Sequence, residues 1–195
     1  IVSISAGFYH SMFLASNGSV YTCGDNWYGQ LGDGSTSQRN TPVQVKNVVG
    51  QTGFLSNIVS ISAGGYHSMF LDSNGSVYAC GINENGQLGD GSTTDRSTPV
   101  QVKGVNGTGT LSNIASISAG QYHSMFLASN GSVYACGDNV VGNLGDGSTT
   151  NRSTPVQVKN VVGQTGFLSN IASISAGQYH SMFLASNGSV YACGY

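Results

Sequence analysis

Residues 1–26 of the chain read IVSISAGFYHSMFLASNGSVYTCGDN, and close copies of this stretch begin again at Ile58, Ile114 and Ile171. A segment that recurs at a nearly constant interval indicates a repeat architecture, in which each copy is one structural unit packed against its neighbours. The sequence therefore predicts three full repeats and one partial repeat that belong to one domain. Their expected boundaries are 1–57, 58–113, 114–170 and 171–195.

Each full copy has the pattern of four short β-strands separated by turn residues. In the first copy the apolar runs are IVSIS, HSMFLAS, SVYTCG and TPVQVK, which begin at residues 1, 10, 19 and 41. The Asn17-Gly18 pair between the second and third runs is typical of a two-residue hairpin turn. Pairing outward from such a turn predicts one face with His10, Met12, Leu14, Tyr21 and Cys23, and another with Ser11, Phe13, Val20 and Thr22.

Both predicted faces carry apolar side chains, so each sheet needs cover on two sides. A neighbouring copy stacked on each side provides that cover. Pro42, Pro99 and Pro155 open the last strand of each copy, and proline favours an edge strand because it has no N–H to donate. The small residues of the SISAG run suit a crowded central axis. We therefore predict an all-β fold: a partial β-propeller with four-stranded antiparallel blades, whose ring closes only through more repeats or another chain.

The charge content is low and argues against a nucleic-acid partner. The chain has six Lys and Arg and eight Asp and Glu, a net charge of -2. Binding of the phosphate backbone depends on clustered basic side chains. No apolar run reaches the length of a spanning helix, which is about 18 residues or more, so we expect no membrane insertion. The Ser-, Thr-, Asn- and Gly-rich composition leans weakly towards the exterior of a bacterium.

The repeated motifs resemble those of the regulator of chromosome condensation (RCC1-like) repeat family. The motifs are AGFYHSMFLASNGSVYTCG at 6–24, GDNWYGQLGDGST at 24–36 and TPVQV at 41–45, and they recur in the same order along the chain. The resemblance implies a seven-bladed propeller with a binding role, such as guanine-nucleotide exchange on the GTPase Ran, a chromatin or ubiquitin-ligase module, or a secreted inhibitor of β-lactamase. The chain differs in having Cys-Gly where the family has Trp-Gly, and fewer than four repeats. No motif identifies an exchange-factor contact residue.

No pattern in the sequence predicts catalysis, a cofactor or a metal. Equivalent Cys residues of neighbouring blades are expected about 10 Å apart, too far for a disulfide, so we expect buried thiols. A His10, Cys23 and Asp25 site fails in later copies, which have Ile82 and Tyr195 at the Asp position. Each His is instead expected to bond loop backbone between blades, and the Asp of LGDGST to make an Asp-Gly turn. The Asn-Gly-Ser sequons are explained by the hairpin. We therefore expect a protein that is not an enzyme.

Differences among the copies concentrate in two places that a four-stranded meander brings to one rim. These are the residue after Ala-Gly and the pair inside the GxNxxG motif. Exposed aromatic side chains among few charges are typical of a protein-binding patch, although drift in exposed loops also explains such variation. We expect Phe8, Trp27 and Tyr28 to anchor an unidentified protein partner. The predicted contact positions are Phe8, Trp27 and Tyr28 in the first copy, Gly65, Glu84 and Asn85 in the second, and Gln121, Val140 and Val141 in the third.

The two ends of the repeat array are predicted to expose apolar blade faces, because neither Ile1 nor Tyr195 begins a polar cap. Three arrangements remain open: a fragment of a longer propeller, two chains that close one ring, or end-to-end addition into a filament. We expect the isolated chain to self-associate. The alternative function is accordingly a structural subunit that assembles through its open faces.

Overall fold

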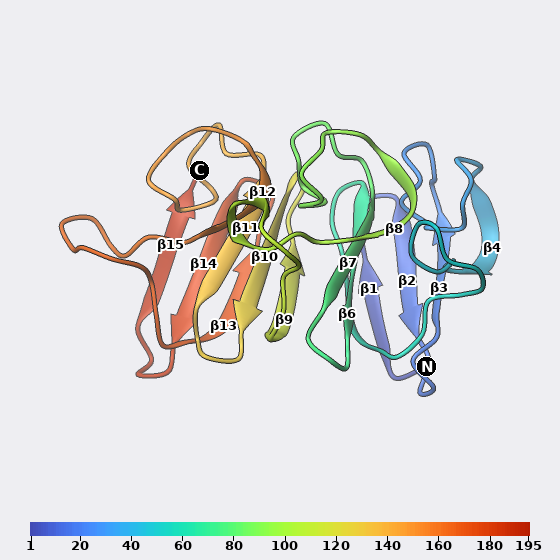
Figure 1. Ribbon diagram of the computed structural model, residues 1–195, viewed down its shortest axis with the longest axis horizontal. Helices are drawn as coiled ribbons and strands as arrows, with labels where there is room; N and C mark the ends of the chain where they lie inside the picture. The colour runs from blue at the N-terminus through green and yellow to red at the C-terminus, as the bar shows by residue number, and fades with distance from the viewer.

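The computed structural model describes residues 1–195 and has four separate antiparallel β-sheets (Figure 1). Three sheets have four strands, and the last has three, each in sequence order. The only helical segment is the short η1 (Val105–Gly107), and no helix is long and apolar enough to cross a membrane. The strands are β1 (Ser3–Ala6), β2 (His10–Leu14), β3 (Val20–Gly24) and β4 (Arg39–Gln44); β5 (Ile58–Ala63), β6 (His67–Asp72), β7 (Val77–Gly81) and β8 (Arg96–Gln101); β9 (Ile114–Ala119), β10 (His123–Ala128), β11 (Val133–Gly137) and β12 (Arg152–Gln157); β13 (Ile171–Ala176), β14 (His180–Ala185) and β15 (Val190–Gly194).

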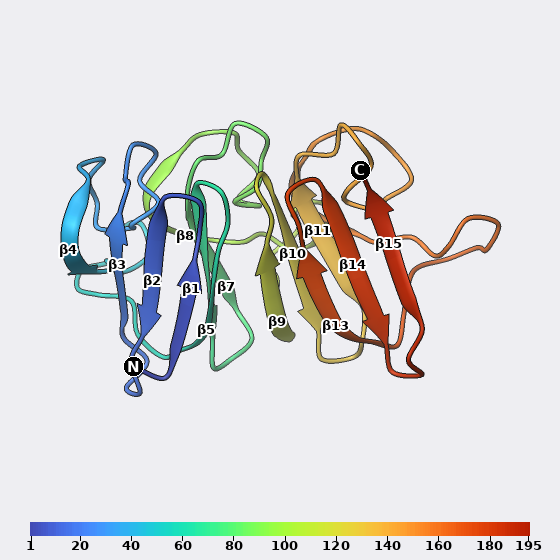
Figure 2. The same cartoon turned by 180° about the vertical axis from the view of Figure 1, so that it is seen from behind.

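The sheets stand side by side as blades around a common axis, and the ring is not closed (Figures 1 and 2). The first strands of the blades, β1, β5, β9 and β13, contact one another in succession and lie innermost. Small residues permit this approach: the Ala63 amide donates to Ser5 Oγ at 2.9 Å, and the same bond recurs at the next two junctions. The proline-containing strands β4, β8 and β12 lie at the free edges of their sheets. The predicted four-stranded antiparallel blades of a partial propeller are confirmed.

The predicted hairpin turn is wrong by one residue. Leu14 pairs with Val20, and the Ala15 amide donates to the Ser19 carbonyl at 2.9 Å, so the loop contains three residues. Gly18 alone takes a positive φ, of 79°. This geometry is that of a type I turn followed by a left-handed glycine, the usual three-residue hairpin. Asn-Gly is compatible with both loop lengths, and the pairing of the flanking strands selects the longer one.

The changed register moves the third strand's side chains to the opposite face from the one predicted. Val20 and Thr22 share a face with His10, Met12 and Leu14, because they lie directly opposite residues of that set. Tyr21 and Cys23 share the other face with Ser11 and Phe13. A shift of one residue has this effect because side chains alternate along a strand.

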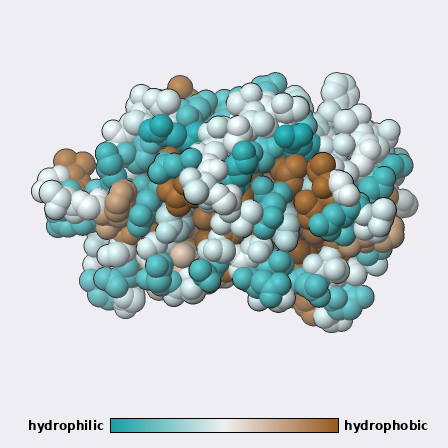
Figure 3. Space-filling view, in the orientation of Figure 1, coloured by the Kyte–Doolittle hydropathy of each residue, from teal (hydrophilic) through white to brown (hydrophobic).

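Three buried apolar clusters occupy the three junctions between neighbouring blades. At the first junction, Met12, Leu14 and Val20 of one blade pack against Ile61 and Phe70 of the next. The other two junctions repeat this arrangement. The core is therefore divided among the blade interfaces, as the apolar character of both sheet faces predicts. Seen in the orientation of Figure 1, hydrophobic residues appear mainly in recessed strips between polar loops (Figure 3).

Each full blade is joined to the next by a buried histidine. His10 Nε2 lies 2.8 Å from Ser68 Oγ, and Ser68 Oγ donates to the Gln30 carbonyl at 2.7 Å. Since the serine's one proton goes to the carbonyl, His10 Nε2–H donates to the serine and Nδ1 carries no proton. The predicted direct bond from His to loop backbone is wrong: a serine of the next blade lies between them.

The histidine–serine link recurs at the next two junctions and keeps the histidines neutral. His67 bonds Ser124 at 2.9 Å, and His123 bonds Ser181 at 3.0 Å. Burial lowers the pKa of His10 to about 4, of His67 to about 3 and of His123 to about 4. These groups therefore pack as uncharged rings at neutral pH.

The expectation of buried thiols holds at two of the four positions. Cys80 and Cys136 are buried, whereas Cys23 and Cys193 are partly exposed; all four are free thiols. Burial raises the pKa of the Cys80 and Cys136 thiols. Each of these two sulfurs lies 3.6 Å from a carbonyl of the preceding blade, so they pack as weak donors at the junctions.

Candidate functional site

The turn after the first strand and the loop after the third strand emerge at the same edge of every blade, uppermost in Figure 1. We call this edge, with its β1–β2 and β3–β4 connections and their counterparts, the upper rim. It carries all nine positions that the comparison of copies singles out. The length and shape of its larger loops depend on a buried asparagine in each full repeat.

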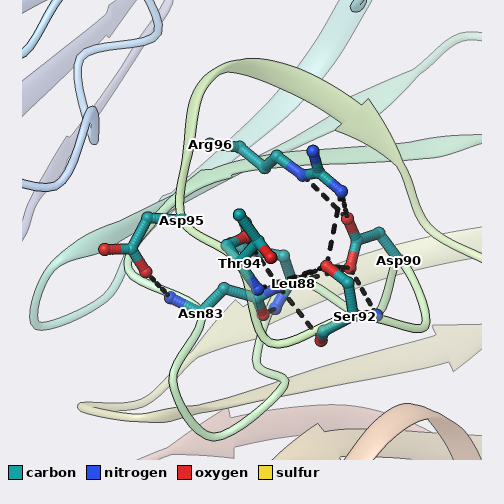
Figure 4. Close-up of polar contacts among 7 residues, drawn as sticks. All are labelled: Asn83, Leu88, Asp90, Ser92, Thr94, Asp95 and Arg96. Carbon is teal, nitrogen blue, oxygen red and sulfur yellow. Dashed lines mark hydrogen bonds and ion pairs between the residues drawn. The ribbon is translucent and has the colours of Figure 1, made fainter.

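Asn83 organises the loop between β7 and β8 from within (Figure 4). Its Nδ2 donates to Asp90 Oδ1 at 3.2 Å and to the Ser92 and Thr94 carbonyls, both at 3.1 Å. Its Oδ1 accepts from the Leu88 amide at 3.0 Å. Asn26 and Asn139 make the same set of bonds in the other repeats. The loops therefore present their tips from a rigid base.

The aspartate of each LGDGST motif is more than an Asp-Gly turn residue. Arg96 Nη2 lies 2.8 Å from Asp90 Oδ2, and the pairs Arg39–Asp33 and Arg152–Asp146 are each 2.7 Å long. Burial alone would raise the pKa of these carboxyls, but hydrogen bonds from serine and arginine lower it below its ordinary value. Each rim arginine is thus neutralised by an aspartate of its own loop.

The structure brings Phe8, Trp27 and Tyr28 to one end of the upper rim. Phe8 follows β1 and is exposed, and Trp27 follows β3 with 76% of its surface exposed. Tyr28 is half-buried because its ring packs edge-on against Tyr66, with centroids 5.5 Å apart. The three side chains come from two connections of one blade, as the meander predicts.

A row of tyrosines that the comparison of copies passes over extends this aromatic group along the rim. The rings of Tyr9 and Tyr66 lie 5.4 Å apart, and those of Tyr66 and Tyr122 are stacked at 6.2 Å. Phe8 meets Tyr9 edge-on at 6.4 Å. Each tyrosine precedes the junction histidine of its repeat. Its recurrence in every copy is the signal that could have placed it on the rim, since the residue before an inward-facing His points the other way.

A cavity of about 350 Å³ opens within the aromatic group. Asp25 is its one charged lining residue, and Asp25 Oδ2 accepts a hydrogen bond from Gln30 Nε2 at 2.7 Å. This bond holds the carboxylate in place at the start of the loop. We call this cavity the rim pocket. Its lining residues are Tyr9, Asp25, Trp27, Tyr28, Gln38 and Tyr66.

The predicted contact positions of the second repeat differ in their exposure. Glu84 is exposed, and Asn85 Oδ1 accepts from Asn151 Nδ2 at 3.0 Å, which ties the second rim loop to the third. Gly65 is buried, with its amide donating to the Gly120 carbonyl at 3.2 Å. A Cβ at this position would lie 2.8 Å from the Gln121 carbonyl oxygen. Gly65 therefore permits close packing of two turns and offers no side chain to a partner.

The predicted contact positions of the third repeat are mostly exposed and aliphatic. Val140 and Val141 are exposed on their rim loop, and Gln121 is half-buried. They lie away from the rim pocket, none of whose lining residues belongs to the third repeat. In the structure no three His, Cys, Asp or Glu side chains form a group that could hold a metal ion.

Comparison with known proteins gives the family of this repeat array. A family model described as the RCC1-like domain matches residues 1–195. The chain belongs to the RCC1-like domain family. The resemblance seen in the repeated motifs is thereby confirmed over the whole chain. This RCC1-like chain is 33% identical over 196 residues to the probable E3 ubiquitin-protein ligase HERC4 of Rattus norvegicus, and 30% identical over 196 residues to the ultraviolet-B receptor UVR8 of Arabidopsis thaliana.

The RCC1-like chain corresponds to part of each relative. It aligns in full, but it spans only 17% of HERC4 and 41% of UVR8. Among solved structures, human WBSCR16 matches with a TM-score of 0.80 and 23% identity, over 98% of this chain and 46% of that one. Yeast RCC1 (Prp20) matches with a TM-score of 0.76 and 24% identity, over 100% and 44%. These likenesses establish the propeller fold.

Proposed function

We propose that this RCC1-like chain is a non-enzymatic protein-binding module whose contact surface is the upper rim of its first repeat. The observation that carries the proposal is the exposure of Phe8 and Trp27 beside the rim pocket, on loops held rigid by Asn26. Rigid, exposed aromatic side chains are the usual anchors of protein interfaces, because they bury a large area at little cost in conformational entropy.

Replacing the three anchors together tests this proposal. We expect the Phe8→Ser, Trp27→Ser, Tyr28→Ser variant to lose partner binding. Its free energy of unfolding should fall by only about 1 kcal/mol, because Tyr28 alone makes a packed aromatic contact. The matched control is Val140→Ser with Val141→Ser, which changes the corresponding loop positions of the third repeat. Affinity capture from cells, followed by calorimetry with the purified captured protein, measures both effects. Equal affinity of the wild type and the triple variant for that protein would contradict the proposal.

A second candidate function is self-assembly through the two open blade faces. Ile4, on the first open face, is 74% exposed, whereas its counterpart Ile61 within the array is 7% exposed. Met182, on the last open face, is 42% exposed, whereas Met12 is fully buried. Ile61 and Met12 pack in the same junction cluster, so the first face of one copy has the chemistry of the surface that covers the last face of another.

We expect the 195-residue chain to form dimers or longer assemblies at micromolar concentration. Met182→Lys should shift it to the monomer, because a charge buried in that junction has no partner. Val162→Lys is the control, since Val162 lies fully exposed on a connecting loop. Sedimentation velocity measures the distribution of masses, and electron microscopy distinguishes rings from fibres. A single monomeric species of the wild type at micromolar concentration would rule out this function.

A further inference from the structure

The rim pocket has the geometry of an aromatic cage. Tyr66 forms one wall, Tyr28 meets it at an interplanar angle of 75°, and Tyr9 lies across it at 34°. Trp27 lines the same cavity. Aromatic rings set at different angles present several electron-rich faces to one enclosed volume, and such faces attract cations.

The charges around the pocket favour a cationic ligand. Asp25 lines the cavity, and its carboxylate is oriented by Gln30. Glu84, on the next rim loop, is exposed and has no basic partner among the ion pairs of the chain. Arg39, Arg96 and Arg152 are each paired with the aspartate of their own loop. The rim therefore presents carboxylates without competing free cations.

The other repeats do not reproduce this combination. At the positions of Asp25, Trp27 and Tyr28, the second repeat has Ile82, Glu84 and Asn85, and the third has Asp138, Val140 and Val141. The carboxylate recurs in the third repeat without the aromatic walls. The cage thus belongs to the first repeat alone, on a scaffold that the other repeats share, and the blade architecture itself does not need it.

We propose that the rim pocket binds the trimethylammonium group of a methylated lysine side chain presented by a protein partner. A quaternary ammonium suits this site because it gives up little hydration and needs no hydrogen-bond acceptor, so aromatic faces and one carboxylate satisfy it. Presentation by a protein follows from the exposed Phe8 and Trp27 around the opening, which extend the contact surface beyond the pocket. The inference rests on the proposed function and names the group that the first repeat recognises.

The test uses Trp27 as a reporter, because it is the only tryptophan of the chain. The probes are three peptides with the same flanking residues and a central trimethyllysine, unmodified lysine or the neutral tert-butyl isostere of trimethyllysine. We expect the trimethyllysine peptide to change the Trp27 fluorescence and to bind about tenfold more tightly than the neutral isostere, which is the cation–π and carboxylate contribution. Unmodified lysine should bind more weakly than trimethyllysine, because its ammonium is more strongly hydrated.

Two matched variants separate the charge of the pocket from its shape. Asp25→Asn keeps the size of the side chain, and it should weaken trimethyllysine binding several-fold while leaving the neutral isostere unaffected. Asp138→Asn makes the same change in the third repeat and should alter neither affinity. Circular dichroism melts establish that both variants fold.

Three outcomes would overturn the inference. They are equal affinity for the charged and neutral peptides, no effect of Asp25→Asn, and binding of free choline as tight as that of the peptide, which would assign the pocket to a small molecule. If the anchors are needed for partner capture but the peptides show no preference for the cation, the proposed function stands and this inference fails. Loss of both results would refute the two together.

Discussion

Acidification from pH 7 towards pH 4 is expected to unfold this protein through its three junction histidines. The pKa of His10 and of His123 is about 4 in the folded chain, and that of His67 is about 3, whereas an unfolded histidine has a pKa of about 6.5. Below the unfolded value the unfolded chain binds more protons than the folded one, so stability falls as the pH falls. Each histidine contributes about 1.4 kcal/mol per pH unit, or about 4 kcal/mol per unit for the three.

Urea denaturation at a series of pH values between 7 and 4 measures this dependence. His67→Gln should reduce the slope by about a third, because one titrating group is lost. His180→Gln is the matched control: His180 occupies the same repeat position but is exposed on the last open face, with no following blade to cover it. A free energy of unfolding that stays constant from pH 7 to pH 5 would refute the neutral, buried histidine links.

The second large effect is expected from Phe70, which fills the junction between the first two blades. Phe70 is fully buried, so Phe70→Ala should lower the free energy of unfolding by about 3–5 kcal/mol, the usual cost of removing a buried phenylalanine ring. Its counterpart Phe13 lies on the first open face and is only half-buried. Phe13→Ala should cost about 1 kcal/mol, because much of the ring is already in contact with water.

Chemical denaturation followed by circular dichroism compares the two variants. The measurement belongs at low protein concentration, where association through the open faces does not cover Phe13. Equal losses for Phe70→Ala and Phe13→Ala would show that the two positions have the same surroundings, and would contradict the stacking of blades face to face.

Much of the architecture could be predicted because it depends on local patterns. The recurrence of residues 1–26 predicts the repeats, and the apolar character of both faces predicts stacked sheets. The edge position of the strands that contain Pro42, Pro99 and Pro155 follows from the missing N–H of proline. The common rim of Phe8, Trp27 and Tyr28 follows from the path of a four-stranded meander.

The errors all concern contacts between segments distant in the sequence. The hairpin at Asn17-Gly18 was assigned one residue too short, because a turn sequence compatible with two lengths is decided by the strands it joins. Ser68 as the partner of His10 was missed because the two residues belong to different blades. Gly65 was counted as a contact residue, although a neighbouring turn buries it.

The sequence by itself determined that this RCC1-like chain is built from repeated antiparallel blades, because strand periodicity, turn residues and proline act over a few residues. Only the tertiary structure decided which side chains meet: the register of each hairpin, the histidine–serine links and the rim pocket formed by Tyr9, Tyr28 and Tyr66. The physical reason is that Tyr66 comes from the neighbouring blade, and the distance between two rings depends on how the blades pack, a relation that no local pattern encodes.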